Sequence, residues 1–368
     1  MTRIRDGEAV PDSKLPVEIV VSPGAPRGCH YIEPAPLSVR DAMPGAIDAP
    51  HYYENKRYRL RSDENGLLLC GDPPASPDYS IVVFGESTIE DRYIEEPLRC
   101  VSIARTELEK LTSLKIDMRN ASVSGVHSMH SILMLLTKVI PLRPDAVVLV
   151  QNINDLKQLM YFGSYWTTYG NHTFLYPKAA QQPAAARPLP VRVMSAAARR
   201  LRALARRLLP QSASASQPIQ EKKQKMEWWE YSVPQQGLAL TDFETLSGNF
   251  RSSMEAFVGV CRAWGIKPVL ATQPNRITGT EPPDATIRTQ MAPLFELGLD
   301  YQSYARLYHG FNATIREVAT QLDVPLIDLE QHVPKEPALI WDSVHLTPAG
   351  AKASGESLAA GLRSALFV

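Results

Sequence analysis

From residue 79 onward the chain alternates between strands and helices, and this pattern begins with Ser80-Ile81-Val82-Val83-Phe84-Gly85 followed by Glu86-Ser87-Thr88. The first stretch is a short run of apolar, mostly β-branched residues, which predicts a strand buried on both faces of a parallel sheet. The strand ends at a glycine, and Ser87 stands just beyond it. A rigid strand end can hold a nucleophilic hydroxyl and leave it accessible. Capping of the following helix is the alternative role for this serine.

The same alternation continues to the end of the chain. Helices are predicted at 94–111, 126–139, 242–264, 304–322 and 348–366, and strands at 115–118, 146–151, 267–272 and 325–328. Strands that alternate with helices pair in parallel, because the return to a parallel neighbour requires a crossover. The sequence therefore predicts a three-layer α/β/α sandwich with a central parallel sheet. Sites in such folds lie at the carboxyl ends of the strands.

The N-terminal segment departs from this pattern. Residues 1–78 are rich in proline and glycine, and we expect them to form an extension packed on a main domain of residues 79–368. Within the extension, the alternating stretch 58–61 and the apolar stretch 67–69 flank Asn65-Gly66. This arrangement predicts a short hairpin.

An insertion is predicted between about residues 156 and 240. Its stretches 181–186 and 210–216 have the composition of flexible linkers. Between them, 191–209 should form a basic amphipathic helix with arginines beside an apolar stripe. Three roles are open for it: a solvated helix packed on its own domain, a helix on an anionic membrane surface, or a contact with a partner or a second copy of the chain.

The composition excludes several classes of protein. The chain has 368 residues, of which 44% are hydrophobic, and a formal net charge of +0, so nothing global indicates nucleic acid as a partner. It has no apolar run of about 18 residues and no secretory signal, which predicts a cytoplasmic or peripheral membrane protein. Export is the alternative, because a signal or anchor that is missing from this sequence would leave the same pattern. Its four cysteines, Cys29, Cys70, Cys100 and Cys261, lack zinc spacing and should be free thiols. We expect no metal and no cofactor.

A second polar string precedes the last predicted helix: Asp342-Ser343-Val344-His345-Leu346-Thr347-Pro348. A helix cap at Thr347 and a proline in the first turn explain its end but not its Asp-x-x-His. A serine hydroxyl becomes a strong nucleophile when a base removes its proton, and the base needs an acid that fixes its tautomer. His345 and Asp342 fit these two roles for Ser87. A surface Asp/His pair is the alternative.

Two further strand ends carry candidate donors for an oxyanion. Ser122-Val123-Ser124-Gly125 and Asn152-Ile153-Asn154-Asp155 each follow a predicted strand. Ester cleavage passes through a tetrahedral anion that preorganised donors stabilise. Gly125 leaves its backbone N–H accessible and Asn154 offers a side-chain NH2, although each residue type is also common in turns.

In type and order, Ser87, Gly125, Asn154 and the Asp342/His345 pair resemble the four blocks for which the SGNH hydrolase superfamily of GDSL esterases and lipases is named. The resemblance covers residues 79–366 without the insertion. It implies a flavodoxin-like sheet with Ser87 as nucleophile, His345 as base and Asp342 as its partner. It also implies an oxyanion hole made of the N–H groups of Ser87 and Gly125 and the side chain of Asn154.

The chain departs from the family pattern at two positions. Glu86 stands where the family has aspartate, and Asn152 stands where it has glycine. Neither replacement removes a residue of the triad or of the oxyanion hole. Together with 163–166, Gly-Ser-Tyr-Trp, this variant resembles bacterial SGNH proteins of surface-polysaccharide assembly. The resemblance implies a serine esterase that removes acyl groups, chiefly acetyl, from a carbohydrate. The alternatives are an O-acyltransferase with the same triad and a non-catalytic glycan-binding or assembly protein.

Other side chains near the same strand ends are candidate substrate contacts. They are polar or aromatic: Asn152, Asp155, His127, Tyr165, Trp166, Gln273 and Asn275. Aromatic faces bind sugar rings, and they also simply pack in cores. His127 and His130 have no carboxylate or cysteine companion in the sequence, so a structural or pocket-lining role is favoured over a metal site.

Overall fold

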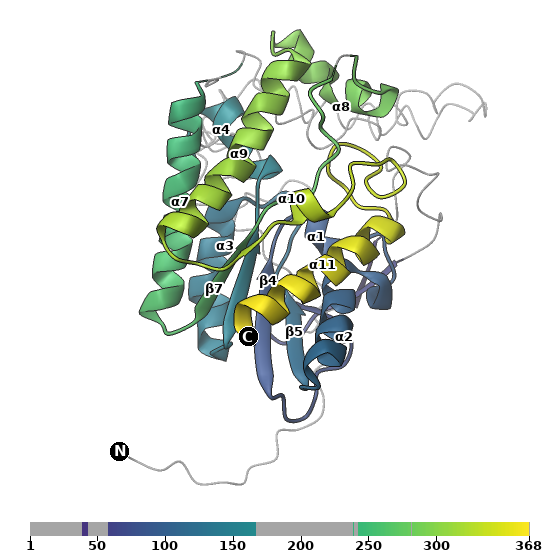
Figure 1. Cartoon of the computed structure of the whole chain (residues 1–368), viewed down its shortest axis with the longest axis vertical. Coiled ribbons are helices and arrows are strands. Elements are labelled where there is room, and N and C mark those ends of the chain that lie inside the picture. Colours follow the sequence, from purple (N-terminus) through teal and green to yellow (C-terminus); the bar gives the residue numbers. More distant parts are fainter. Residues whose placement is uncertain (1–38, 43–57, 167–237, 239–241, 281, 368) are drawn as a thin grey trace, which may run out of the picture.

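Six strands form the central sheet of the protein (Figure 1). The computed structural model describes residues 39–42, 58–166, 238, 242–280 and 282–367. The strands lie in the order β3 (Leu68–Leu69), β5 (Ile116–Asn120), β4 (Tyr79–Phe84), β6 (Ala146–Val150), β7 (Lys267–Ala271) and β8 (Leu326–Ile327). Helices cover both faces of this sheet, so the predicted α/β/α sandwich is confirmed.

The five strands from β4 to β8 are parallel, and β4 lies between β5 and β6. Val83 of β4 pairs with Asn120 on one side and with Val148 on the other. In chain order these strands follow the flavodoxin-like arrangement 2-1-3-4-5, whose chain reversal between β4 and β6 creates a crevice at the carboxyl edge. The short β3 is antiparallel to β5, which makes the sheet mixed.

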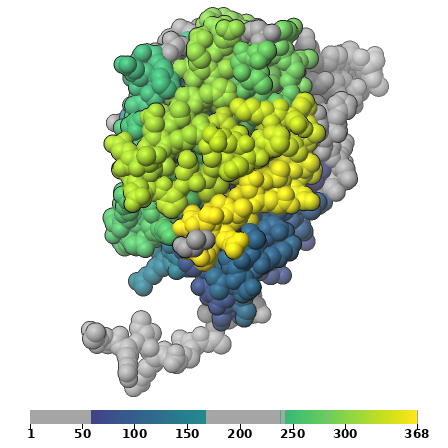
Figure 2. All heavy atoms as spheres, in the orientation of Figure 1, coloured from purple at the N-terminus to yellow at the C-terminus, as the bar shows by residue number. Residues whose placement is uncertain are grey.

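One face of the sheet is covered by α2 (Cys100–Thr112) and α11 (Pro348–Leu366), which lie against each other. The opposite face carries α3 (Ser128–Met134), α4 (Ile153–Phe162), α7 (Phe243–Ala263) and α9 (Tyr301–Gln321). Two apolar cores result, one on each side of the sheet. In the space-filling view, the segments around α9 and α11 face the viewer and hide the strands behind them (Figure 2).

Shorter elements complete the described chain: β1 (Val39–Ala42), β2 (Tyr58–Arg61), α1 (Ser87–Glu90), η1 (Glu96–Leu98), the π-helical η2 (Leu135–Val139), η3 (Ile140–Leu142), α8 (Ala285–Glu296) and α10 (Leu329–His332). None of the helices in the described ranges is long and apolar enough to span a membrane.

The sequence explains where the last helix begins and why it packs closely. The Thr347 hydroxyl accepts the Gly350 N–H at 3.1 Å, and Pro348 occupies the first position of α11. At Gly355, a Cβ atom would lie 2.6 Å from the Cys100 carbonyl oxygen. The lack of a side chain there therefore lets α11 approach the start of α2, which brings the preceding Asp342/His345 segment to the carboxyl edge of the sheet.

Three sequence expectations need correction or stay open. The hairpin of 58–61 with 67–69 forms only at its turn, where Ser62 and Leu68 make an antiparallel bridge and the Asp63 N–H donates to the Leu67 carbonyl at 2.8 Å. Beyond the turn, β2 pairs with β1 and β3 joins the main sheet. Helix α4 occupies the predicted start of the insertion, and α8 was not predicted. The basic helix 191–209 lies outside the described residues.

The cysteines were expected to be free thiols. Cys70, Cys100 and Cys261 are free and buried. Cys29 lies outside the described residues. Burial is the main factor that raises the pKa of Cys70 and of Cys261 to about 12, so these two thiols remain protonated near neutral pH.

Candidate active site

Ser87 is the first residue of α1, directly beyond the end of β4. The turn between them passes through Gly85, where a Cβ would lie 2.7 Å from the Ile89 Cβ and 2.9 Å from the Ser122 Oγ. Only glycine fits such a close approach without displacing its neighbours. The hydroxyl therefore stands at the switch point of the sheet, and Ser87 is partly exposed.

His345 and Asp342 lie in the loop before α11 and continue the series from Ser87. The Ser87 Oγ is 2.9 Å from His345 Nε2, and His345 Nδ1 is 2.6 Å from Asp342 Oδ2. An ionised carboxylate only accepts hydrogen bonds, so the Nδ1 proton of neutral His345 points to Asp342. The lone pair of Nε2 then faces the Ser87 hydroxyl. The imidazole side chain is 32% exposed, whereas that of Asp342 is 3% exposed.

Four hydrogen bonds converge on the Asp342 carboxylate. Oδ1 accepts the backbone N–H groups of Val344 at 2.8 Å and His345 at 2.7 Å. Oδ2 accepts Gln290 Nε2 at 3.0 Å in addition to the imidazole. Burial raises the pKa of Asp342, but the charge of His345 and these hydrogen bonds outweigh burial and hold the pKa below its usual value. The buried group is thus kept as an anion next to the imidazole.

Arg276 braces the loop that carries this pair. Its guanidinium donates from Nε to the Asp342 carbonyl at 3.1 Å and from Nη2 to the Trp341 carbonyl at 2.9 Å. Its backbone N–H donates to the Ser343 carbonyl at 2.8 Å, and Asp284 pairs with its Nη1. Sequence reasoning missed this residue, because nothing in its local sequence links it to a loop more than 60 positions away.

Trp341 places an aromatic ring beside the imidazole. The two rings are stacked, with centroids 5.7 Å apart and planes inclined by 18°. The tryptophan is half-buried. Sequence reasoning missed Trp341, and only its position directly before Asp342 could have indicated it. Its ring forms an apolar wall next to His345.

Gly125 and Asn154, two of the candidate oxyanion donors, lie in the loops after β5 and β6, which contact each other. Gly125 lies in the turn after β5 with φ +83, a value that favours glycine. The Asn154 side chain donates to the Val126 carbonyl at 2.9 Å and so ties the two loops together. An amide NH2 has two hydrogens, which leaves one for a ligand. Within the described ranges, no hydrogen bond occupies the backbone N–H of Ser87 or of Gly125.

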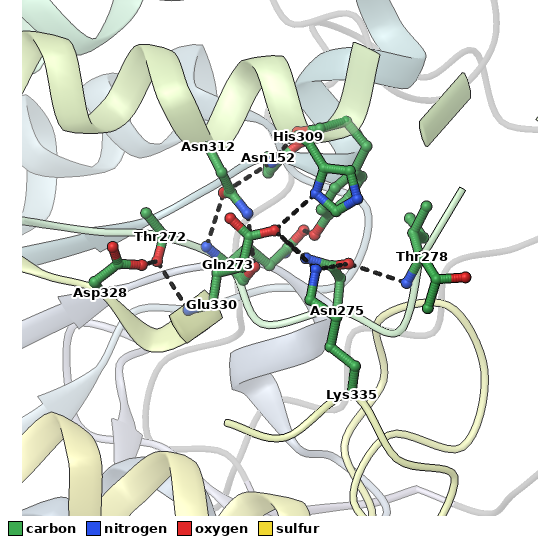
Figure 3. A network of polar contacts seen from close by, with 12 residues as sticks. Asn152, Thr272, Gln273, Asn275, Thr278, His309, Asn312, Asp328, Glu330 and Lys335 are labelled. Atoms are coloured by element: carbon green, nitrogen blue, oxygen red, sulfur yellow. Dashed lines mark hydrogen bonds and ion pairs between the residues drawn. The ribbon is translucent and has the colours of Figure 1, made fainter. Parts of the chain in front are cut away.

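Several predicted substrate contacts are fully buried. The Asn152 side chain points away from the site and donates to the Tyr308 carbonyl at 3.1 Å and to Asn312 Oδ1 at 2.9 Å. Gln273 donates to Glu86 Oε1 at 2.7 Å and accepts the Tyr308 hydroxyl at 2.6 Å. Figure 3 shows Asn152, Gln273 and Asn312 converging in the interior. Because these side chains expose no surface, we assign Asn152 and Gln273 to support of the loops rather than to substrate contact.

Asp155, Tyr165 and His127 form another interior group. Asp155 accepts the Ser128 N–H at 3.0 Å and the Tyr165 hydroxyl at 2.6 Å, and the Ser128 hydroxyl also bonds to it. Burial raises the pKa of Asp155 to about 6. The His127 ring lies 5.1 Å from the Tyr165 ring. All three side chains are buried, and the bonds of Asp155 hold the start of α3 against α4. Trp166, in contrast, is 51% exposed and stays a candidate substrate contact.

Asn275, in the loop that follows β7, belongs to a charged cluster between α9 and α10 (Figure 3). Its side chain donates to Glu330 at 2.8 Å, and Glu330 also bonds His309 and Arg316, each at 2.8 Å, and Lys335 at 3.3 Å. Burial raises the pKa of Glu330, but these bonds, with His309 first, lower it further than burial raises it. This cluster anchors α10 to α9 and keeps Asn275 buried, which argues against the predicted substrate contact.

Comparisons with known proteins matched this chain to solved structures alone. No protein-family model and no curated protein matches the chain. Similar solved structures include a lipase/acylhydrolase from Enterococcus faecalis, with 12% identity, a TM-score of 0.43, and coverage of 78% of this chain and 96% of the other. An acetyl xylan esterase variant from Geobacillus stearothermophilus has 13% identity, a TM-score of 0.42, and coverage of 79% and 96%.

Proposed function

We propose that the protein is a serine esterase that hydrolyses ester-linked acyl groups. The observation that carries this proposal is the unbroken series from the Ser87 hydroxyl through His345 to Asp342, with contacts of 2.9 and 2.6 Å. A surface Asp/His pair would have no reason to meet a hydroxyl 258 residues away at a strand end. The series is the arrangement that acyl transfer through a serine requires.

The reaction follows from the positions of the groups. The Ser87 oxygen attacks the ester carbonyl while His345 Nε2 takes its proton, and buried Asp342 stabilises the resulting imidazolium. The N–H groups of Ser87 and Gly125 and the free hydrogen of the Asn154 amide are assigned to the carbonyl oxygen, which becomes negative. His345 then protonates the leaving alcohol. Water attacks the acyl-enzyme in the same way and restores Ser87.

For the substrate, we propose a short acyl group, chiefly acetyl, on a carbohydrate. Trp341 supports this proposal because its ring lies next to His345, and His345 must reach the leaving hydroxyl. An aromatic face at that place can pack on a sugar ring. The resemblance of the sequence to proteins of polysaccharide assembly points to the same class of substrate.

The test compares wild type with Ser87→Ala on p-nitrophenyl acetate and on a panel of acylated polysaccharides, with released acid measured by mass spectrometry. We expect the variant to lose at least about four orders of magnitude in kcat. Ser354→Ala is the control, since it removes a buried hydroxyl in α11 that has no hydrogen-bond partner among the described atoms. Near wild-type hydrolysis by Ser87→Ala would refute the proposal. Acyl transfer to an added bare glycan, without acid release, would identify a transferase instead.

A further inference from the structure

Two buried glutamates flank the nucleophile, one at the N-cap of α1 and one at its last residue. Glu86 directly precedes Ser87 and is 0% exposed, and Glu90 follows three residues later and is 2% exposed. Buried carboxylates are costly unless hydrogen-bond donors surround them. Which donors they use is therefore informative about why they stand there.

Glu86 binds the loop after β6. Its Oε1 accepts the Asn152 N–H at 3.3 Å, and its Oε2 accepts the Asn154 N–H at 3.2 Å. Gln273 adds a third bond, from Nε2 to Oε1, at 2.7 Å. The Glu86 carboxyl group thus fixes the backbone of Asn154, and the side chain of Asn154 is the proposed oxyanion donor.

Glu90 binds the loop after β5 in the same way. Its Oε2 accepts the Ser124 N–H at 2.8 Å and is also bonded by the Ser124 hydroxyl. Ser124 immediately precedes Gly125, the proposed backbone donor. A single turn of helix therefore presents the nucleophile and holds each of the two neighbouring loops by one carboxylate.

We infer that Glu86 and Glu90 are positioning residues that set the oxyanion donors of both loops at a fixed distance from Ser87. This inference rests on the proposed esterase function. Donors stabilise the developing anion only when they are preorganised, and a misplacement of about 1 Å can cost roughly a hundredfold in rate. Because both loops are fastened to the helix that carries Ser87, nucleophile and donors keep their spacing when the surrounding structure fluctuates.

The chain offers a matched control for this pair of contacts. Asp145 Oδ2 accepts the Ser80 N–H at 2.7 Å and the Ser80 hydroxyl at 2.8 Å, which is the same chemistry as the Glu90 contact with Ser124. Asp145 and Ser80 stand at the amino ends of β6 and β4, at the opposite edge of the sheet from Ser87. Asp145→Asn therefore perturbs a carboxylate–serine contact without touching the oxyanion loops.

The experiment measures kcat and KM on p-nitrophenyl acetate for wild type, Glu86→Gln, Glu90→Gln, Glu90→Met and Asp145→Asn. The assay is run at about pH 9, where Glu86 is ionised and both of its oxygens accept. An amide has a single acceptor oxygen, so in Glu86→Gln its NH2 must face one of the loop N–H groups, and we expect kcat to fall about a hundredfold with KM within a few-fold. Glu90→Met should lose a similar factor, and Glu90→Gln, which keeps one acceptor for the Ser124 N–H, should recover most of it. Asp145→Asn should keep kcat within about twofold.

A second readout separates donor placement from general damage to the fold. A small boronic acid forms an anionic tetrahedral adduct on the serine oxygen, with one of its boron-bound hydroxyl oxygens in the oxyanion hole. Its affinity should fall in Glu86→Gln and Glu90→Met by the same factor as kcat/KM, while the affinity of a non-reactive ester analogue stays within a few-fold.

The outcomes can be told apart. Wild-type turnover and labelling of Ser87 by a fluorophosphonate, combined with unchanged kcat in the Glu86 and Glu90 variants, would overturn this inference alone. A parallel fall of the boronate and analogue affinities would also overturn it, because that result indicates a distorted site rather than misplaced donors. A folded wild type that neither turns over esters nor labels at Ser87 would overturn the proposed function, and this inference with it.

Discussion

Gln290 offers a sharp test of how the Asp342/His345 pair is oriented. This residue of α8 is half-buried, donates to Asp342 Oδ2 at 3.0 Å, and accepts the Ser343 N–H at 3.1 Å. Gln290→Met removes both hydrogen bonds with little change in side-chain length. Gln290→Glu keeps an acceptor for the Ser343 N–H but replaces the donor to Asp342 by a second carboxylate.

The expected magnitude follows from the surroundings of Asp342. A hydrogen bond to a charged group contributes about 1.5–3 kcal/mol, which corresponds to roughly 10- to 150-fold if its loss fell entirely on the transition state. Three other bonds to the carboxylate persist in the variant, so we expect Gln290→Met to lower kcat about tenfold at all pH values. In Gln290→Glu, two carboxylates at this distance resist simultaneous ionisation. The loss should therefore grow as pH rises and Glu at this position ionises.

The assay is the pH dependence of kcat on p-nitrophenyl acetate between pH 5 and about 9, with stability followed by urea unfolding. Thr289→Met and Thr289→Glu are the controls, because Thr289 is the exposed neighbour on α8 and its hydroxyl bonds only within the helix, to the Ala285 carbonyl. They introduce the same side chains one position away from Asp342.

Two results would refute this reasoning. One is a Gln290→Met variant with the same kcat as Thr289→Met. The other is a Gln290→Glu variant whose loss relative to wild type does not change with pH. Either result would mean that the remaining contacts of Asp342 orient His345 by themselves.

Three other predictions concern the support of the site. Arg276→Met leaves the Trp341 and Asp342 carbonyls without their charged donor. We expect the free energy of unfolding, measured in urea, to fall by about 3 kcal/mol and kcat for ester hydrolysis to fall about a hundredfold. A variant with wild-type kcat would contradict this expectation. Gly85→Ala brings a methyl group to 2.7 Å from the Ile89 Cβ and should cost about 1–3 kcal/mol in thermal unfolding, whereas an unchanged Tm would show that the turn can open. Burial, followed by the charge of Asp155, raises the pKa of Glu86 from 4.5 to about 8. Between these pH values the carboxyl keeps a proton in the folded protein that it has lost in the unfolded chain. The free energy of unfolding should therefore fall as pH rises through this range. Urea unfolding from pH 5 to 8 should show a shallower fall in Glu86→Gln, and equal slopes would disprove it.

The architecture could be predicted from the sequence because its signals are local. Short stretches of sequence are enough to predict three of the elements: the buried run from Ile81 to Phe84, the apolar run of β6 and the capped start of α11 at Thr347. Alternation of strands and helices then leaves few arrangements. The 58–69 hairpin is limited to its turn and the bridge of Ser62 with Leu68, because β2 otherwise pairs with β1 and β3 with β5, two contacts with distant segments that the local pattern does not contain.

The candidate triad could be proposed from spacing, whereas its support could not. Ser87, Asp342 and His345 each have a local alternative, but together they supply the three groups of a triad in strings that lie at predicted strand and helix ends. Arg276 and Gln290 act through contacts with a loop 50 to 70 positions away, which no window of sequence contains. Asn152 was expected beside the oxyanion site because its neighbours are there, but Tyr308 and Asn312 of α9 draw its side chain inward.

The very different chain separations within the triad have a consequence for refolding. Asp342 and His345 make their contacts within three residues, so this part can form as soon as the loop does. The hydroxyl joins them only after a stretch of 258 residues has closed, when α11 docks along α2. During refolding, the return of ester hydrolysis should lag behind the helical circular dichroism signal. The rate at which hydrolysis returns would then report the docking of the C-terminal helix.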